Sequence, residues 1–438
     1  MGGVYKLAPI VVMLVVSAAV VATARGATLV SETTWGGADT ESTNGAAVAA
    51  DGSSYLTGST RSFDPFLQEN VFLVKFAANG SLTWQRTFKG PAQFGIDRAT
   101  GVAVATDGSV YVTGQTLGVG NDVLVLKFSP DGSLLWQRRW DAGGNETGAA
   151  VAVASDGAVF VTGETDSFGG FGHQFVLRLA PEGTLDWQRI RNVATDVSVG
   201  SGQGIAVGPD GAVYAAGVVP RPGAVGDFDT LLMKLDPQGG LVWQRAFSAA
   251  DVVDARGGVT VAADGSVYVA GGLLETTRQR AVNDTLIAKF APDGTLIWAR
   301  GYGGDDGDFP GGVTTRPNGT VLIGGENGDA FLLQLDGSSG RGIACNSWGG
   351  AEIDTGDDVE VAPDGTIVLG ATTGSSPPFV FADCSRRTSR VRGTVTAPEV
   401  PLEDATGTLA DPGGTVATPN GSSPGAGGFD AALVRIAP

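Results

Sequence analysis

Acidic side chains are the residues of this 438-residue sequence that could most readily do chemistry. Asp305, Asp306 and Asp308 stand together in a glycine-rich stretch, and Asp357 and Asp358 form a smaller acidic pair. Ca²⁺ prefers several oxygen ligands on a flexible loop, so the first three aspartates are candidate calcium ligands. Their spacing does not match an EF-hand loop, and acidic loops are usually only solvated, so a solvated loop is the favoured interpretation.

Other residue types that serve catalysis or metal binding are scarce. The sequence has one histidine, His173, and no serine or cysteine motif accompanies it, so a Ser-His-Asp mechanism has no support. Two carboxylates could act as acid and base, as in glycosidases, but aspartate is too common here for a pair to be identified. One histidine and two cysteines exclude zinc clusters and haem ligation. We therefore predict no catalytic residues, and no cofactor other than a possible calcium ion.

The two cysteines, Cys345 and Cys384, are predicted to form a disulfide bond, with two free buried thiols as the alternative. The prediction assumes export to an oxidising compartment. Residues 1–24 indicate export, because Lys6 precedes an apolar run that ends in the A-x-A cleavage pattern at 22–24. A cleaved signal peptide is favoured over a retained membrane anchor. We therefore expect a secreted, periplasmic or cell-surface protein, with membrane contact only if this segment is retained.

The formal net charge of −18 argues against a nucleic-acid partner, because nucleic-acid affinity depends on basic surface. One basic cluster stands out within the Pro/Gly-rich residues 371–428. We regard its arginines as candidate binding residues, although a segment of this composition can equally be a decoration without a partner. The cluster consists of Arg386, Arg387, Arg390 and Arg392.

One sequence motif recurs along the whole chain. In its clearest copy, residues 101–138, a strand of small residues leads through an Asp-Gly turn to a strand, a loop, an apolar strand ending in Lys-Phe, a second Asp-Gly turn and the motif Leu-x-Trp-Gln-Arg. An Asp-Gly turn before β-branched or aromatic residues predicts a β-hairpin in which Gly adopts a positive φ. The first turn recurs at Asp51, Asp107, Asp156, Asp210, Asp264, Asn318 and Asp364, and the tryptophan at Trp84, Trp136, Trp187, Trp243, Trp298 and Trp348.

Seven first turns but six such tryptophans indicate how the ends of the chain meet. The N-terminal stretch ending at Trp35 is typical of a fourth strand without a repeat before it, and the last copy, residues 429–436, stops after the third strand. Pairing of these two ends would close seven four-stranded units into a ring and remove the exposed sheet edge. We predict an all-β protein with one seven-bladed β-propeller over residues 27–438, four antiparallel strands per blade. We expect the small-residue strand to lie innermost.

One position in the third strand is basic in six copies. Its side chain could lie over a neighbouring tryptophan face or simply point to solvent, and the sequence does not choose between the two. The residues are Lys75, Lys127, Arg178, Lys234, Lys289 and Arg435.

The repeat resembles the SBBP-type bacterial and archaeal β-propeller repeat family. The resemblance is carried by residues 348–365 and 108–116, and it extends over nearly the whole chain outside residues 371–428. It implies an exported or cell-surface protein, often combined with adhesion-type modules, and it implies no catalytic residues. Asn318, Gly324 and Gly370 depart from the pattern, so the sixth and seventh blades are expected to be the least regular.

The loops sort onto two faces of such a ring. The Asp-Gly turns share one face and are short and uniform, whereas the long loops 59–70, 190–203 and 218–227 and the 371–428 insertion are expected on the other. Variable insertions on one face commonly mark the binding face of a repeat protein. We predict a monomeric, noncatalytic binding or scaffold module with a protein or glycan partner. The alternative is a secreted enzyme, either a quinone-cofactor dehydrogenase or a carboxylate-using glycan hydrolase or lyase.

Overall fold

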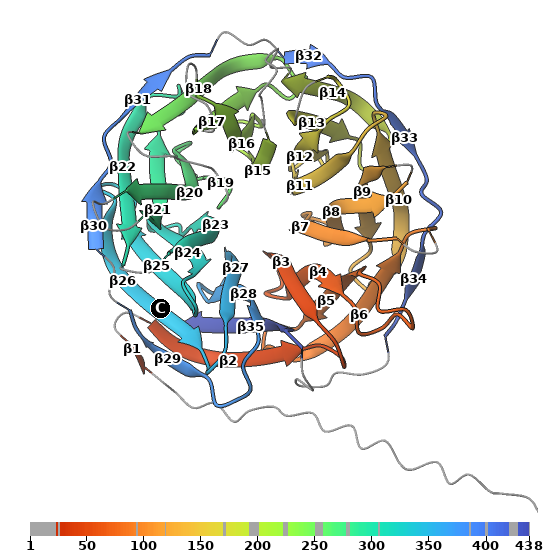
Figure 1. Ribbon diagram of the computed structural model, residues 1–438, viewed down its shortest axis with the longest axis horizontal. Coiled ribbons are helices and arrows are strands. Elements are labelled where there is room, and N and C mark those ends of the chain that lie inside the picture. Colours follow the sequence, from red (N-terminus) through yellow and green to blue (C-terminus); the bar gives the residue numbers. More distant parts are fainter. Residues whose placement is uncertain are drawn as a thin grey trace, which may run out of the picture.

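The computed structural model describes residues 23–24, 27–92, 95–118, 120–169, 172–191, 201–221, 227–249, 257–276, 281–304, 307–384, 387–398, 402–419 and 428–437. Within these residues the strands form seven sheets, arranged as blades around a central axis (Figure 1). The molecule is therefore an all-β, seven-bladed β-propeller, as the repeat predicts. In the same residues no helix is long and apolar enough to cross a membrane.

Four strands of each blade follow one another from the axis outward (Figure 1). In blade 1 they are β3 (Glu41–Val48), β4 (Ser54–Thr60), β5 (Asn70–Phe76) and β6 (Leu82–Lys89), and in blade 2 they are β7 (Arg98–Val104), β8 (Val110–Leu117), β9 (Asn121–Phe128) and β10 (Leu134–Asp141). In blade 3 they are β11 (Glu146–Val153), β12 (Val159–Thr165), β13 (His173–Leu179) and β14 (Leu185–Arg191), and in blade 4 they are β15 (Ser201–Val207), β16 (Val213–Pro220), β17 (Phe228–Leu235) and β18 (Leu241–Ala249). In blades 5 to 7 they are β19 (Val259–Val261), β20 (Val267–Thr276), β21 (Ala281–Phe290) and β22 (Leu296–Gly303); β23 (Phe309–Thr315), β24 (Thr320–Glu326), β25 (Ala330–Asp336) and β26 (Arg341–Gly349); β27 (Asp354–Val361), β28 (Ile367–Thr373), β35 (Asp430–Ala437) and β2 (Ala27–Trp35).

The Asp-Gly turns form the hairpins that the sequence predicts. Between β7 and β8, Gly108 has a φ of 80° and its N–H donates to Ala105 O at 2.9 Å. The carboxylate of Asp107 accepts a hydrogen bond of 2.8 Å from Ser109 N. A left-handed glycine after a tight turn matches the right-handed twist of the two strands, which explains why Gly recurs at this position.

The ring closes through its two chain ends. Strand β2 pairs antiparallel with β35, from Thr28 opposite Ala437 to Trp35 opposite Ala431, and β35 pairs on its other side with β28. Blade 7 is thus built from the N-terminal strand and three C-terminal strands. The predicted closure is confirmed.

A fifth strand on every blade was not predicted. Residues 380–384, 387–398 and 402–419, which we call the belt, run once around the outside of the ring (Figure 1). Six short strands of the belt pair antiparallel with the outer strands of blades 6, 5, 4, 3, 2 and 1 in that order. They are β29 (Val380–Asp383), β30 (Arg387–Arg390), β31 (Gly393–Thr396), β32 (Leu402–Asp404), β33 (Thr408–Ala410) and β34 (Thr415–Ala417), while β1 (Thr23–Ala24) is the fifth strand of blade 7.

The belt therefore corrects the expected position of residues 371–428 on the face of the long loops. Its strands are three or four residues long, so each piece carries little strand pattern. The outer edge of each four-stranded sheet offers unpaired backbone groups, which these pieces satisfy. Glutamines of the outer strands add hydrogen bonds to the belt, such as Gln85 Nε2 to Pro419 O at 2.8 Å and Gln244 Nε2 to Pro398 O at 2.6 Å.

The tryptophans of the outer strands occupy two positions, where the sequence analysis treated them as one. Trp84 lies opposite Lys75, and its equivalents in the next four blades also face the basic residue of the third strand. Trp348 and Trp35 instead lie opposite Ala330 and Ala431, at the far end of the strand. Both positions lie on one strand four residues apart, so counting tryptophans in the sequence could not separate them.

In three blades the basic side chain of the third strand that faces a tryptophan helps to join its blade to the next. In blade 1, Lys75 is only 9% exposed, lies 5.3 Å from the centroid of Tyr55, and donates to Pro130 O of blade 2 at 3.3 Å. Trp84 Nε1 donates to the same carbonyl at 3.0 Å. The lysine therefore covers a tyrosine rather than a tryptophan, and it does not point to solvent. Burial of its stem and the cation–π contact both favour this position.

Candidate functional site

The axis of the ring encloses a cavity of about 480 Å³ lined by the innermost strands of all seven blades. Small residues let these strands approach closely: a Cβ on Gly204 would lie 2.6 Å from Gly258 Cα, and one on Gly45 would lie 3.1 Å from Gly101 Cα. The contact at Gly204 needs glycine, because real Cβ atoms essentially never come within 3.0 Å of a neighbouring atom, and the contact at Gly45 would be unusually tight for a Cβ. The inner position expected for the small-residue strand is therefore confirmed.

Blade 7 replaces these small residues with carboxylates. Asp357, Asp358 and Glu360 of β27 line the cavity, and Glu164 of blade 3 joins them. No lysine, arginine or histidine is found among the described lining residues. The equivalent residues in the other blades are found by counting back from the first turn of each repeat. They are Asn44, Gly45 and Ala47 in blade 1; Thr100, Gly101 and Ala103 in blade 2; Ala149, Ala150 and Ala152 in blade 3; Gln203, Gly204 and Ala206 in blade 4; Gly257, Gly258 and Thr260 in blade 5; and Gly311, Gly312 and Thr314 in blade 6.

Hydrogen bonds hold two of these carboxylates in place. Asp357 accepts from Thr355 Oγ1 at 2.9 Å and from Thr372 Oγ1 at 2.8 Å. Asp358 Oδ2 accepts from Ala46 N of blade 1 at 2.9 Å, and its Oδ1 accepts from Val359 N at 2.8 Å. These bonds fix the direction of both carboxylates without bringing a compensating positive charge.

The cluster is electrostatically uncompensated, and the pKa values of its members rise accordingly. Burial raises the pKa of Asp357 to about 8, against the hydrogen bonds of two threonines and with repulsion from Glu326 and Asp358. Burial raises the pKa of Asp358 to about 6. For Glu360, burial and then repulsion by Asp358 raise the pKa to about 8. The cavity can therefore accept a cation or hold protons at neutral pH.

A second type of buried carboxylate lies at the junctions between blades. Ten residues before the first turn of a repeat, an acidic side chain begins or immediately precedes the innermost strand and accepts a backbone hydrogen bond from the preceding blade. Asp354, for example, is fully buried and accepts from Gly350 N at 2.7 Å and Ser375 Oγ at 2.9 Å. The described members of this set are Glu41, Asp97, Glu146, Asp308 and Asp354.

Most of these junctions carry a partner at the start of the third strand, five residues before the basic position. Asp430 and Glu41 converge on Gly36, and Asp329 and Asp354 converge on Gly349. The histidine His173 occupies the third-strand position in blade 3, where it is fully buried and its Nε2 lies 2.6 Å from Gly169 O. Its place in this set indicates a structural role.

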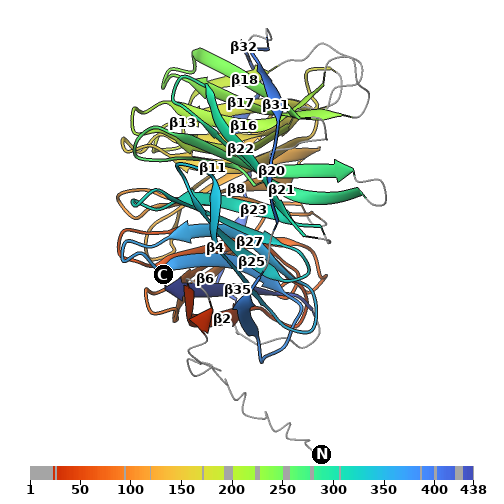
Figure 2. The same cartoon turned by 90° about the vertical axis from the view of Figure 1, so that its left-hand side faces the viewer.

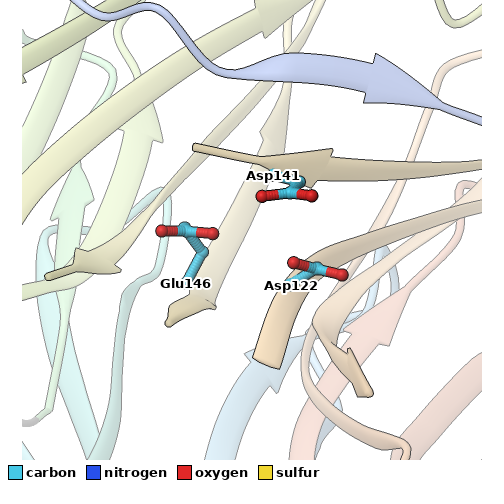
Figure 3. Close-up of side chains that lie close together, drawn as sticks. All are labelled: Asp122, Asp141 and Glu146. Atoms are coloured by element: carbon cyan, nitrogen blue, oxygen red, sulfur yellow. The ribbon is translucent and has the colours of Figure 1, made fainter. Parts of the chain in front are cut away.

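The junction of blades 2 and 3 differs because three carboxylates meet there. Asp122 at the start of β9, Asp141 at the end of β10 and Glu146 at the start of β11 each place one oxygen within 4.8 Å of the others (Figure 3). Glu146 accepts from Thr165 Oγ1 at 2.9 Å and from Ala142 N at 3.1 Å. Burial, opposed by Arg139 and aided by repulsion from the two other carboxylates, raises the pKa of Asp122 to about 6.

Some residues singled out by sequence fall elsewhere. Asp305 and Asp306 lie outside the described residues, so the proposed calcium loop stays a prediction. Asp308 is 1% exposed and accepts from Gly304 N at 2.7 Å, in the junction position described above. The predicted disulfide between Cys345 and Cys384 is present, and it ties the outer strand of blade 6 to the belt just after β29.

The arginine cluster lies on the rim rather than on a loop face. Arg387 and Arg390 end the belt strand β30, which pairs with β22 of blade 5. Arg390 and Arg392 are exposed, and Arg386 lies outside the described residues. The four arginines stay a predicted binding site, and the cavity is formed by other residues.

Sequence reasoning noticed Asp357 and Asp358 but missed Glu360, Glu164 and the junction carboxylates. A signal for both sets was present. Aligning the repeats on their first turns shows acids in blade 7 where the other copies have mostly small residues. The same alignment shows an acid ten residues before the turn in six of seven copies.

The fold and the cavity together define a β-propeller with an acidic axis. A family model described as "Domain of unknown function (DUF5122) beta-propeller" matches residues 154–186, in blade 3. This match and the WD40 structure of Pan2 described below support membership of a β-propeller family in the broad sense. No curated protein sequence matches the chain.

Solved structures with a similar fold have diverse descriptions. The WD40 domain of Pan2 from Neurospora crassa is 12% identical, over 80% of this chain and 94% of that chain, with a TM-score of 0.50. The polysaccharide lyase Uly1 is 11% identical, over 92% of this chain and 90% of that chain, with a TM-score of 0.47. A protein of unknown function from Bacteroides caccae is 13% identical, over 63% and 95%, with a TM-score of 0.39. At these identities the likeness concerns the fold alone.

Proposed function

We propose that this chain is an exported, noncatalytic binding module whose central cavity takes a positively charged group of its ligand. The observation that carries the proposal is the replacement of small residues by Asp357, Asp358 and Glu360 in a cavity without described basic residues. Burying carboxylates without an opposite charge costs free energy, and a bound cation returns part of it. A cationic ligand therefore fits this cavity better than an anionic or neutral one.

The size and position of the cavity favour a single side chain or sugar unit of a larger partner. About 480 Å³ accommodates an amine-bearing group but not a folded domain. Asp357, Asp358 and Glu360 are the fourth, fifth and seventh of the eight residues of β27, so the cluster extends from the middle of the strand toward the Asp-Gly turn. The rest of a protein or glycan would contact the loops outside the cavity. We propose a primary amine, such as a lysine side chain, as the group that enters.

Export is part of the proposal and is supported by two features. The N-terminal residues 1–24 have the pattern of a signal peptide, and the disulfide between Cys345 and Cys384 is of the kind that persists in oxidising compartments. The SBBP-type resemblance of the repeat favours the same location. A monomer is proposed as the functional state.

One observation favours a second function, a carboxylate-using glycan hydrolase. Asp357 and Asp358 are adjacent in a cavity, and their pKa values of about 8 and about 6 would suit an acid and a base at neutral pH. In this hypothesis Asp357 donates the proton and Asp358 acts as the base. We favour binding because Asp357 and Asp358 are held by hydrogen bonds to their own fold.

The binding proposal is tested by calorimetry at pH 8 with a trilysine peptide and the same peptide acetylated at every Nζ. Lysine stays charged at this pH, so only acetylation removes the positive charge. We expect trilysine to bind and the acetylated peptide not to bind. The double variant Asp358→Asn with Glu360→Gln should lose at least about tenfold in affinity, since the uncompensated charge is removed. Glu403→Gln, which removes one exposed negative charge on the belt, should bind like the parent protein.

Equal affinity for the two peptides, or unchanged binding in the double variant, would contradict the proposal. The hydrolase hypothesis is tested separately by incubating the protein with polysaccharides and measuring chain length. Shortening that disappears in Asp357→Asn but persists in Glu403→Gln would make the protein an enzyme.

A further inference from the structure

The junction of blades 2 and 3 has a third carboxylate where other junctions have none. Asp141 directly follows the aromatic position at the end of its outer strand. The residue in the same place is Gly36 at the junction of blades 7 and 1, Gly303 at that of blades 5 and 6, and Gly349 at that of blades 6 and 7. A side chain at Gly349 would lie 2.5 Å from Asp329 Oδ1 and 2.8 Å from Asp354 Oδ2. Among the described junctions, only the junction of blades 2 and 3 has an acidic residue at this position.

The three carboxylates have the separation that one divalent cation requires. Ca²⁺ binds oxygens at about 2.3–2.6 Å, so two ligands on opposite sides of the ion are roughly 5 Å apart. One oxygen each of Asp122, Asp141 and Glu146 lies within 4.8 Å of the other two (Figure 3). A single ion can therefore contact all three without movement of the strands.

The buried carboxylate of Asp122 points toward the other two carboxylates, and one of its oxygens lacks a hydrogen bond (Figure 3). Asp122 is 1% exposed, and its Oδ2 accepts no hydrogen bond. Its one charged contact is Arg139 Nη1 at 3.3 Å, from a side chain that is 29% exposed and so can swing toward solvent. A Cβ on Gly118 would lie 1.9 Å from this oxygen, which shows that the approach to it is lined by a residue without a side chain.

We propose that Asp122, Asp141 and Glu146 bind a Ca²⁺ ion that joins blades 2 and 3. The three residues lie on β9, β10 and the following strand β11, so the ion crosslinks two sheets. Water completes the coordination, as is common for Ca²⁺ at protein surfaces. This site is distinct from the central cavity and from the acidic loop around Asp305.

The experiment uses the mature full-length protein, freed of metal with a chelator and titrated with Ca²⁺ or Mg²⁺ by calorimetry. The test variant is Asp141→Gly, which gives this junction the residue found at three of the other six junctions. We expect calcium to bind the parent protein and to raise its melting temperature, because a ligand of the native state stabilises it. In Asp141→Gly the affinity should drop at least about tenfold with loss of one ligand. Mg²⁺ should bind more weakly, since it requires a tighter octahedral site.

Two further variants keep the result decisive. Asp141→Asn retains the volume of the side chain and should lose calcium affinity even if the glycine variant folds poorly. Glu360→Gln changes the central cavity and should bind calcium like the parent protein. Absence of calcium binding by the parent protein at millimolar concentration would overturn the proposal. Binding that Asp141→Gly and Asp141→Asn leave unchanged but Glu360→Gln removes would overturn it too, and would place the ion at the axis. Failure of the trilysine experiment would leave this calcium test unaffected.

Discussion

The polar groups at the axis and at the rim of this propeller differ in whether they have interaction partners. At the rim, each outer strand is covered by a belt strand or by β1, and belt strands such as β31 lie on the outside of the ring (Figure 2). Glutamine side chains and a disulfide add further links to the belt. At the axis, Asp357, Asp358 and Glu360 face a cavity with no described basic partner. The rim therefore adds interactions that stabilise the ring, and the axis carries charges that destabilise it.

This difference separates structural from functional carboxylates within one repeat. Asp354 and Glu360 lie on the same strand, yet Asp354 is fully buried among donors from a serine and a backbone N–H. Glu360 borders the cavity, and its pKa is raised by burial and by Asp358. Strained or uncompensated groups usually persist only where function requires them. The contrast supports the proposal that the axis is the ligand-binding region and the rim its support.

The largest effect is expected at the rim, from loss of the disulfide. Cys345→Ser with Cys384→Ser opens a link between residues 39 apart in sequence, which should lower the free energy of unfolding by about 4 kcal/mol. The reason is that the unfolded chain gains the freedom that the crosslink removed. Denaturant unfolding of the variant and of the parent protein measures the difference.

The control for this change is the parent protein in a reducing agent, which should unfold at the same denaturant concentration as the double variant. Trilysine affinity should stay unchanged, because neither cysteine lines the cavity. A stability change below about 1 kcal/mol would mean that the belt is held to the ring without its covalent link.

An intermediate effect is expected where a glutamine side chain links a buried tryptophan to the belt. Gln188 Oε1 accepts from the buried Trp140 Nε1 at 2.7 Å, and its Nε2 donates to Gly407 O of the belt at 3.2 Å. Gln188→Leu leaves a buried indole N–H without an acceptor, which should cost about 2 kcal/mol in thermal or denaturant unfolding.

Blade 2 offers the matched control. Gln137 occupies the same position and donates to Gly414 O at 3.3 Å, but the neighbouring aromatic residue is Phe88, and Gln137 Oε1 accepts no hydrogen bond. Gln137→Leu should therefore cost clearly less than Gln188→Leu. Equal losses would show that the belt contact, not the indole, provides the stabilisation.

The sequence predicted the ring well because every repeat contains the same local sequence signals. Asp-Gly turns and small inner residues act over a few residues, and the unpaired ends of the chain predicted the closure by β2. The belt was not predictable in this way. Its pieces pair with strands that lie up to about 330 residues away, as Thr415 does with Lys89, and three residues carry too little pattern to identify a partner.

The candidate site was predictable only in part, for a similar reason. Asp357 and Asp358 were visible as neighbours, but their significance depends on what the other six blades place around the same axis. Asp122, Asp141 and Glu146 come from three strands and meet only when two blades pack. Sequence gives the residue types, while the convergence of side chains from different strands follows from the tertiary fold.

The smallest effect is expected at the axis, and its sign is opposite to that at the rim. The folded protein holds the pKa of Glu360 at about 8, above the ordinary value of 4.5, so it keeps a proton that the unfolded chain releases. The stability contributed by this proton is fully present below pH 4.5 and is lost as the pH rises through 8. Between pH 5 and 8 the parent protein should thus become less stable.

The variant Glu360→Gln measures how much of this loss of stability with rising pH is due to one residue. Glutamine cannot ionise, so the variant should be more stable than the parent protein by at least about 1 kcal/mol at pH 8 and should show a shallower loss from pH 5 to 8. Buried neighbours such as Asp358 keep part of the slope in both proteins. Melting temperatures across this range provide the measurement, with Glu403→Gln as the exposed control. If Glu360→Gln were instead less stable at pH 8, an unseen positive charge would compensate the cluster, and the axis would resemble the rim.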